Sequence, residues 1–109
     1  MTDKIVVFSA CDSEEQATGI ARSLVEQRLA ACVNIVPGAR SIYRWKDQIE
    51  DTAEWLLVIK SRRDLLPAIR HEIEKTHSYE VPEVVALQVV GGSENYLAWL
   101  DHELAPAQV

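Results

Sequence analysis

The chain has 109 residues, a hydrophobic fraction of 48% and a charged fraction of 26%, which predicts one globular domain spanning residues 1–109 with a core of its own. Its net charge of −6 argues against non-specific binding to nucleic acid or to an anionic membrane, because both need a basic surface. An acidic balance mildly favours attraction of cations, although it is also a common way for a protein to stay soluble.

The N-terminal part is predicted to form a strand followed by a helix. Ile5–Ala10 is a short apolar run typical of a strand. In Glu14–Leu29 the apolar residues recur at helical spacing and form one apolar face. Ser13, followed three residues later by Gln16, fits a capping box, and Asp12 is the alternative cap.

The next strand is long and interrupted. Ala30–Val36 is small, β-branched and apolar apart from Asn34, and strand character resumes at Ser41–Trp45. Pro37 and Gly38 lie between the two halves; Pro donates no ladder hydrogen bond, and Gly tolerates unusual backbone angles. We predict one strand with a Pro-Gly kink, which would let the strand pair with two neighbours.

A hairpin and a second helix follow. Lys46–Ala53 is polar and is interpreted as a hairpin turn, after which Glu54–Lys60 returns as the third strand. Asp64 is the predicted cap of the second helix, which tolerates Pro67 in its first turn and ends near His77.

The C-terminal part is predicted to contain one strand and one short helix. Val81–Val90 is the fourth strand, with Pro82 at its start, where proline is tolerated. Ser93 caps a helix that extends to about Leu104. The last residues, Ala105–Val109, are expected to fray.

This order of elements, β-α-β-β-α-β with a terminal helix, predicts an α+β fold of the ferredoxin-like type, an antiparallel sheet with both crossover helices on one face. In a sheet with one solvent-exposed face, apolar and polar residues alternate along each strand. Three predicted strand segments are instead apolar on both pleat faces: Ala30–Val36, Trp55–Ile59 and Val84–Leu87. We therefore expect a homo-oligomer in which burial of about 500 Å² of sheet per subunit contributes on the order of 12 kcal/mol before association costs. The alternative is a monomer whose terminal helix folds under the sheet.

The two cysteines and the N-terminal residues indicate the cellular compartment of the protein. Cys11 and Cys32 lie in or beside apolar runs without the spacing of a disulfide framework. The N-terminus does not resemble a signal peptide, and no apolar run approaches the ~20 residues that span a bilayer. We expect reduced thiols, no membrane association and a cytoplasmic protein.

The common catalytic motifs are absent: the sequence has no G-x-S-x-G, P-loop, dinucleotide fingerprint or H-E-x-x-H. A pair formed by Cys11 and His77 is conceivable, but no third group can be assigned to orient it. We therefore do not expect an enzyme, and a small-molecule enzyme that uses an aromatic cleft is the weakest alternative.

The densest candidate for a functional site is His77–Glu83, which carries a histidine, a tyrosine and two glutamates at a helix-to-strand junction. Such a segment can bind a metal, a small ligand or a neighbouring subunit; the alternative is a well-hydrogen-bonded turn. A metal site would need groups from other segments, because this spacing does not itself form a cage. Cys11, at the exit of the first strand, is the thiol nearest an open sheet end.

Aromatic residues gather on the second strand, on the third and in the terminal helix. A buried or subunit-interface role is their default, because aromatic rings supply large contact areas. The alternative is a ligand-binding cleft between subunits, in which Lys60 could hold an anion or equally could guard a sheet edge. The candidates for this cleft are Tyr43, Trp45, Lys60, Tyr79 and Trp99.

Five motifs, which occur in order from Ile5 to about Leu104, closely resemble the CutA family of divalent-cation-tolerance proteins. They are L-A-A-C-V-N-I-V-P-G, S-I-Y-R-W, L-L-V-I-K, H-S-Y-E-V-P-E and N-Y-L-A-W-L. The resemblance implies a ferredoxin-like subunit in a cytoplasmic homotrimer, a role in tolerance of copper and other divalent metals, and no enzymatic activity. The trimer is also similar in shape to the PII signalling proteins, which is an analogy of fold.

The resemblance transfers the metal ligands only in part. Members with a proposed copper site have a cysteine ending the first strand and two adjacent histidines; here Ser9 occupies the cysteine position and only His77 matches the pair. Cys11 could substitute, since it lies on the same pleat face as Ser9. We expect Cu(II) or another divalent cation to bind weakly between subunits. The candidate ligands are His77 first, then Cys11, Glu80 and Glu83.

The competing hypothesis is a PII-like signalling or scaffolding trimer that acts through partner proteins without a physiological metal.

Overall fold

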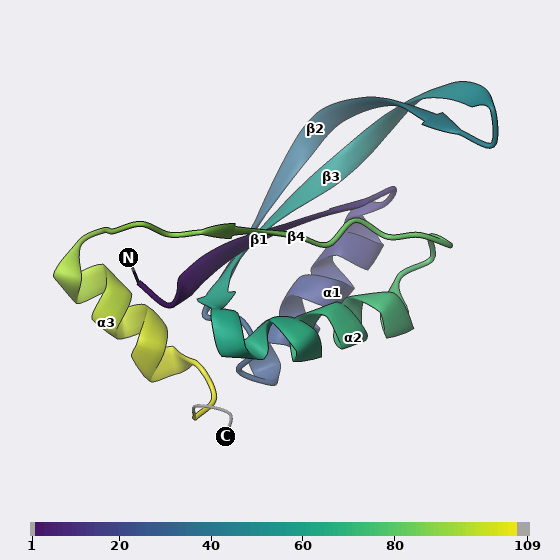
Figure 1. Cartoon of the computed structure of the whole chain (residues 1–109). Helices are drawn as coiled ribbons and strands as arrows, with labels where there is room; N and C mark the ends of the chain where they lie inside the picture. Colours follow the sequence, from purple (N-terminus) through teal and green to yellow (C-terminus); the bar gives the residue numbers. More distant parts are fainter. Residues whose placement is uncertain (1, 107–109) are drawn as a thin grey trace.

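The computed structural model describes residues 2–106 and contains one four-stranded antiparallel sheet and three α-helices. The elements in chain order are β1 (Lys4–Cys11), α1 (Glu14–Glu26), β2 (Cys32–Trp45), β3 (Gln48–Arg62), a 3-10 turn (Arg63–Leu65), α2 (Leu66–Thr76), β4 (Val85–Gln88) and α3 (Glu94–Glu103). The strand order is β2-β3-β1-β4. Figure 1 shows α1 and α2 together on one side of the sheet and α3 at its end. The predicted α+β, ferredoxin-like arrangement is confirmed.

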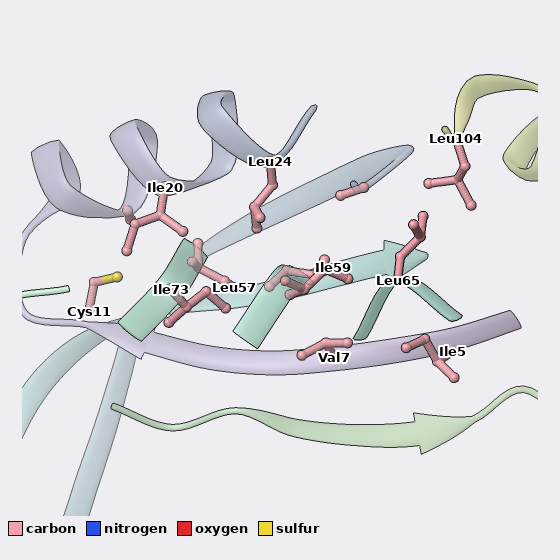
Figure 2. Close-up of a cluster of buried hydrophobic side chains, with 13 residues drawn as sticks. Ile5, Val7, Cys11, Ile20, Leu24, Leu57, Ile59, Leu65, Ile73 and Leu104 are labelled. Carbon is pink, nitrogen blue, oxygen red and sulfur yellow. The ribbon is translucent and has the colours of Figure 1, made fainter. Parts of the chain in front are cut away.

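The core lies between α1, α2 and one face of the sheet (Figure 2). Val7 of β1 and Leu57 of β3 have no exposed surface, and they pack in one cluster with Leu24 of α1 and Ile73 of α2. Burial of a side chain of this kind contributes about 1.5–3 kcal/mol. Because strand side chains alternate between faces, these residues fix which face of each strand meets the helices.

Helix α1 begins at its predicted cap, where the Ser13 hydroxyl accepts a hydrogen bond of 3.1 Å from the backbone N–H of Gln16. The Gln16 side chain reaches the segment after α2 instead of completing a capping box. Its amide donates to the carbonyl of Thr76 at 3.1 Å, and its oxygen accepts from the Ser78 hydroxyl at 2.7 Å. Gln16 therefore fixes the start of the His77–Glu83 segment against α1.

The kink in β2 is confirmed. The pairing with β3 shifts register between Val36 and Ala39, and Gly38 has a left-handed backbone with φ of 79°, which glycine adopts without a steric penalty. Both halves of β2 pair with β3. The prediction that the kink would let this strand pair with two neighbours is therefore wrong within the chain.

Strand β3 begins at Gln48, not at the predicted Glu54. The hairpin turn consists of Lys46 and Asp47 alone, whose φ values are 49° and 63°, as a two-residue turn between twisted strands requires. Four of the six residues 48–53 are polar, and Ile49 among them is 60% exposed. They nevertheless pair with β2, so a polar composition does not prevent strand pairing here. We call residues 39–54, which comprise these two paired segments and their turn, the arm.

Helix α2 and strand β4 also differ from their predicted boundaries. Asp64 does not cap α2; its carboxylate accepts a 2.6 Å hydrogen bond from the side chain of Arg62, and Leu65 occupies the cap position without a side-chain bond. Strand β4 is shorter than the predicted Val81–Val90, because its pairing covers only one half of β1. The residues before β4, including Pro82, form a loop instead.

Ser93 caps α3, as predicted. The chain after this helix is held in place by hydrogen bonds at least to Ala105. The backbone N–H of Ala105 donates to the carbonyl of Arg28 at 2.8 Å, and its own carbonyl accepts from Arg62 at 2.7 Å. The expectation that Ala105–Val109 would fray is wrong for Ala105, and residues 107–109 lie outside the described part of the chain.

The second face of the sheet carries apolar side chains that no helix within residues 2–106 covers, and we call it the open face. Cross-strand pairing brings together on it Val6, Phe8, Ala10, Leu56, Val58, Val85 and Leu87. Val85 and Leu87 are 49% and 50% exposed. Because α3 lies at the end of the sheet (Figure 1), the terminal helix does not fold under the sheet in the way that the monomer alternative expected.

Ser9 is a buried polar residue on the helix-covered face. It has no exposed surface, and its hydroxyl has no hydrogen-bond partner within residues 2–106. A buried hydroxyl without a partner costs about 1–3 kcal/mol. We expect Ser9→Ala to raise the free energy of unfolding by about 1 kcal/mol in urea titrations at fixed protein concentration.

Ser61 provides the matched control for this prediction. It is equally buried, but its hydroxyl donates a 2.5 Å hydrogen bond to the carbonyl of Leu29. Ser61→Ala should therefore lower the free energy of unfolding by about 1 kcal/mol. Equal losses of stability in the two variants would contradict the prediction for Ser9.

Candidate functional site

A pocket of about 430 Å³ lies between the arm and the loop of residues 78–83, and we call it the arm pocket. Three aromatic rings and three carboxylates line it. They belong to Tyr43, Trp45, Tyr79, Glu54, Glu80 and Glu83. The pocket therefore brings together three of the predicted cleft residues and two of the predicted metal ligands.

Glu54, which the sequence analysis did not identify, is the buried acidic group of the pocket. It is 6% exposed, and its carboxylate accepts a 2.7 Å hydrogen bond from the Tyr79 hydroxyl. Burial, together with this hydrogen bond, raises the pKa of Tyr79, so the hydroxyl stays protonated and donates. The available sequence signal was a glutamate directly before the apolar run that starts at Trp55.

His77 lies behind the pocket wall with both ring nitrogens engaged. Nε2 is 2.7 Å from the carbonyl of Ala10, and Nδ1 accepts from the backbone N–H of Tyr79 at 3.0 Å. Because a carbonyl only accepts and a backbone N–H only donates, this pattern fits a neutral ring with its proton on Nε2. In this geometry His77 orders the loop, and a metal could bind Nδ1 only by displacing the Tyr79 hydrogen bond.

Cys11 lies on the same pleat face as Ser9, as predicted, but that face points into the core. Its thiol has no exposed surface, and burial, with smaller contributions from Asp12 and Glu54, raises its pKa to about 11. Cys11 and Cys32 are both free thiols. With the His77 ring already engaged, the described residues give Cys11 no base that would activate it.

The burial of Cys11 predicts low reactivity. At about pH 8, iodoacetamide should alkylate Cys11 far more slowly in the folded protein than in urea, because the thiolate is the nucleophile and a pKa of about 11 leaves little of it. Peptide mass spectrometry over a time course measures both rates. Labelling of the folded protein at the unfolded rate would contradict this placement of the thiol.

The remaining predicted residues lie elsewhere. Lys60 is on the open face, where its ammonium donates to the side chain of Asn34 at 2.6 Å. Trp99 is on α3, with its ring 5.7 Å from that of Tyr96. The five predicted cleft residues therefore do not form one cleft within a single chain.

The four predicted metal ligands are not brought together either. His77 and Cys11 are buried, whereas Glu80 and Glu83 are exposed at the pocket. Across residues 2–106 no group of three or more His, Cys, Asp or Glu side chains is placed to hold a metal ion. Within the same range, no helix is both long enough and apolar enough to cross a membrane.

Comparisons with known proteins show which chains and folds this protein is similar to. The family model described as CutA1 divalent ion tolerance protein matches residues 5–103. The divalent-cation tolerance protein CutA of Thermus thermophilus is 47% identical over 95 residues, which cover 87% of this chain and 92% of the relative. The chloroplastic CutA of Arabidopsis thaliana is 45% identical over 88% of this chain, and the chain spans about half (53%) of that relative's length. The crystal structure of CutA1 from Oryza sativa matches with a TM-score of 0.92 and 41% identity over 95% of each chain.

Proposed function

The chain belongs to the CutA1 divalent ion tolerance family, and on this premise we propose that it is a homotrimeric divalent-cation-tolerance protein. In this proposal the subunits associate through the open face, and Cu(II) or another divalent cation binds weakly in the clefts between them. The protein acts by binding and not by catalysis. Its compartment is the cytoplasm, and cell fractionation tests this, since the Arabidopsis relative is named as chloroplastic.

The observation that carries the trimer is the open face. Phe8, Val58 and Val85 are cross-strand neighbours on three adjacent strands, and they form an apolar surface opposite the core. Contiguous apolar patches of this kind mark interaction sites. A closed ring of copies buries the patch and covers the sheet edges that would otherwise invite further pairing.

The carboxylates of Glu80 and Glu83 support the divalent-cation site. Both side chains are exposed at the pocket rim, and carboxylate oxygens are ordinary ligands of divalent cations. One chain supplies too few converging donors, so the remaining ligands would come from a neighbouring copy. His77 and Cys11 would join such a site only after leaving their present buried contacts.

Two measurements test the proposal. Light scattering at micromolar concentration should give three times the 12.3 kDa mass of one chain. Calorimetric titration with Cu(II) should show weak binding that the double change Glu80→Gln and Glu83→Gln reduces, whereas Glu74→Gln on the exposed surface of α2 leaves it unchanged.

The outcomes separate the two parts of the proposal. A stable single chain would overturn the trimer and its shared clefts. A trimer without metal binding would favour the PII-like alternative, in which partner proteins are the ligands.

A further inference from the structure

Glu54 is a buried carboxylate without a counter-charge in the described structure. It is 6% exposed, its hydrogen bond comes from the neutral hydroxyl of Tyr79, and none of the ion pairs within residues 2–106 includes it. A buried charge is normally paired or bound to a cation, because an unpaired one is costly to desolvate. Since Glu54 lines the arm pocket, the pocket is where a cation could reach it.

Two of the residues that line the same pocket, Trp45 and Glu80, already contact an ammonium group. The Nζ atom of Lys46 lies 5.6 Å from the centre of the Trp45 ring and 3.5 Å from a carboxylate oxygen of Glu80. An ammonium near an aromatic ring is attracted by the ring's negative face. A ring and a carboxylate that line the pocket therefore accept an alkylammonium in this structure.

Within one chain, the dimensions and donors of the pocket interior favour an organic cation over a bare metal ion. A volume of about 430 Å³ suits a small organic molecule, and no three metal-ligating side chains converge within residues 2–106. An alkylammonium ion needs fewer protein ligands than a metal ion does, because one carboxylate can accept its N–H groups and aromatic rings can pack against its alkyl stem. Tyr43, Trp45 and Tyr79 supply those rings.

We propose that the arm pocket binds a primary alkylammonium compound, with the ammonium group donating to Glu54 and the alkyl stem packed against the aromatic rings. This function goes beyond divalent-cation tolerance, because it uses the interior of the pocket and requires no metal ion. Lys46 competes for the rim of the site with its own ammonium group.

Calorimetric titration of the metal-free protein with n-butylammonium tests the proposal. We expect saturable binding with a Kd in the millimolar range, roughly what so small a ligand can achieve. Butanol, which has the same stem without the charge, should not bind measurably. Tetramethylammonium, which has the charge without N–H donors, should bind more weakly than n-butylammonium.

Three variants locate the site. Glu54→Gln keeps an acceptor for Tyr79 but removes the charge, and it should weaken n-butylammonium binding about tenfold or more. Lys46→Met removes the competing ammonium from an exposed position and should tighten binding severalfold. Glu74→Gln, a loss of the same charge on α2, should leave binding unchanged.

Several results would overturn the proposal: no saturation with n-butylammonium, equal binding of butanol or of tetramethylammonium, or an unchanged affinity in Glu54→Gln. Weaker binding in Lys46→Met would do the same, and that variant does not disturb a buried residue. Because all titrations are done without metal, failure here leaves the Cu(II) result and the trimer untouched.

Discussion

Replacing Val58 with aspartate is expected to convert the trimer into single chains. Val58 lies at the centre of the open face, where it pairs with Phe8 of β1 and Asn34 of β2. In the proposed assembly an ionised carboxylate at this position would be buried in every subunit without a partner. Each such burial costs several kcal/mol, and the cost recurs in all three copies. Light scattering should therefore report the 12.3 kDa mass of one chain.

The same substitution on the other side of the molecule is the matched control. Val25 is 42% exposed on α1, away from the open face, so Val25→Asp should keep the trimer mass. Leu87→Asp provides a second test on the open face, at a half-exposed position of β4. Circular dichroism checks that each variant folds. A folded Val58→Asp or Leu87→Asp protein that keeps the trimer mass would show that subunits associate elsewhere.

Much of the fold could be predicted from the sequence because its signals are local. The apolar runs and the cap residue Ser13 identify elements without knowledge of the tertiary structure. The arm could not be predicted in this way, because residues 48–53 are mostly polar and their strand state depends on pairing across the hairpin. Likewise, aspartate is a residue type that commonly caps helices, but the Asp64 carboxylate accepts a hydrogen bond from the buried guanidinium of Arg62 instead.

The site could be predicted only as a set of candidate residues. Tyr79, Glu80 and Glu83 form one conspicuous motif, and the structure places them in the arm pocket. The sequence could not show that the ring of His77 turns inward to the carbonyl of Ala10, because that contact joins segments far apart in the chain. Glu54 was missed for the same reason: its role in the site depends on its burial and on its hydrogen bond with Tyr79, which is distant in the sequence.

Arg62→Met is expected to lower the free energy of unfolding by about 3 kcal/mol. The Arg62 side chain is 6% exposed, and its guanidinium joins three segments. It donates to Asp64 after β3 at 2.6 Å, to Asp101 of α3 at 3.1 Å and to the carbonyl of Ala105 at 2.7 Å. Methionine fills similar space but makes none of these bonds, so the carbonyl and the carboxylates lose a charged donor. The loss should be largest for α3, which these bonds attach to the sheet.

Urea titration and hydrogen exchange measure the two parts of this effect, at one protein concentration for all variants because association contributes to stability. Arg70→Met is the matched control: its side chain is 64% exposed and forms an ion pair with Glu74, and exposed pairs contribute at most about 1 kcal/mol. We expect faster exchange of the α3 amides in Arg62→Met but not in Arg70→Met. Equal stability losses in the two variants would show that the buried guanidinium does not hold α3, because the bonds to Asp101 and Ala105 are what distinguish Arg62 from an arginine on the surface.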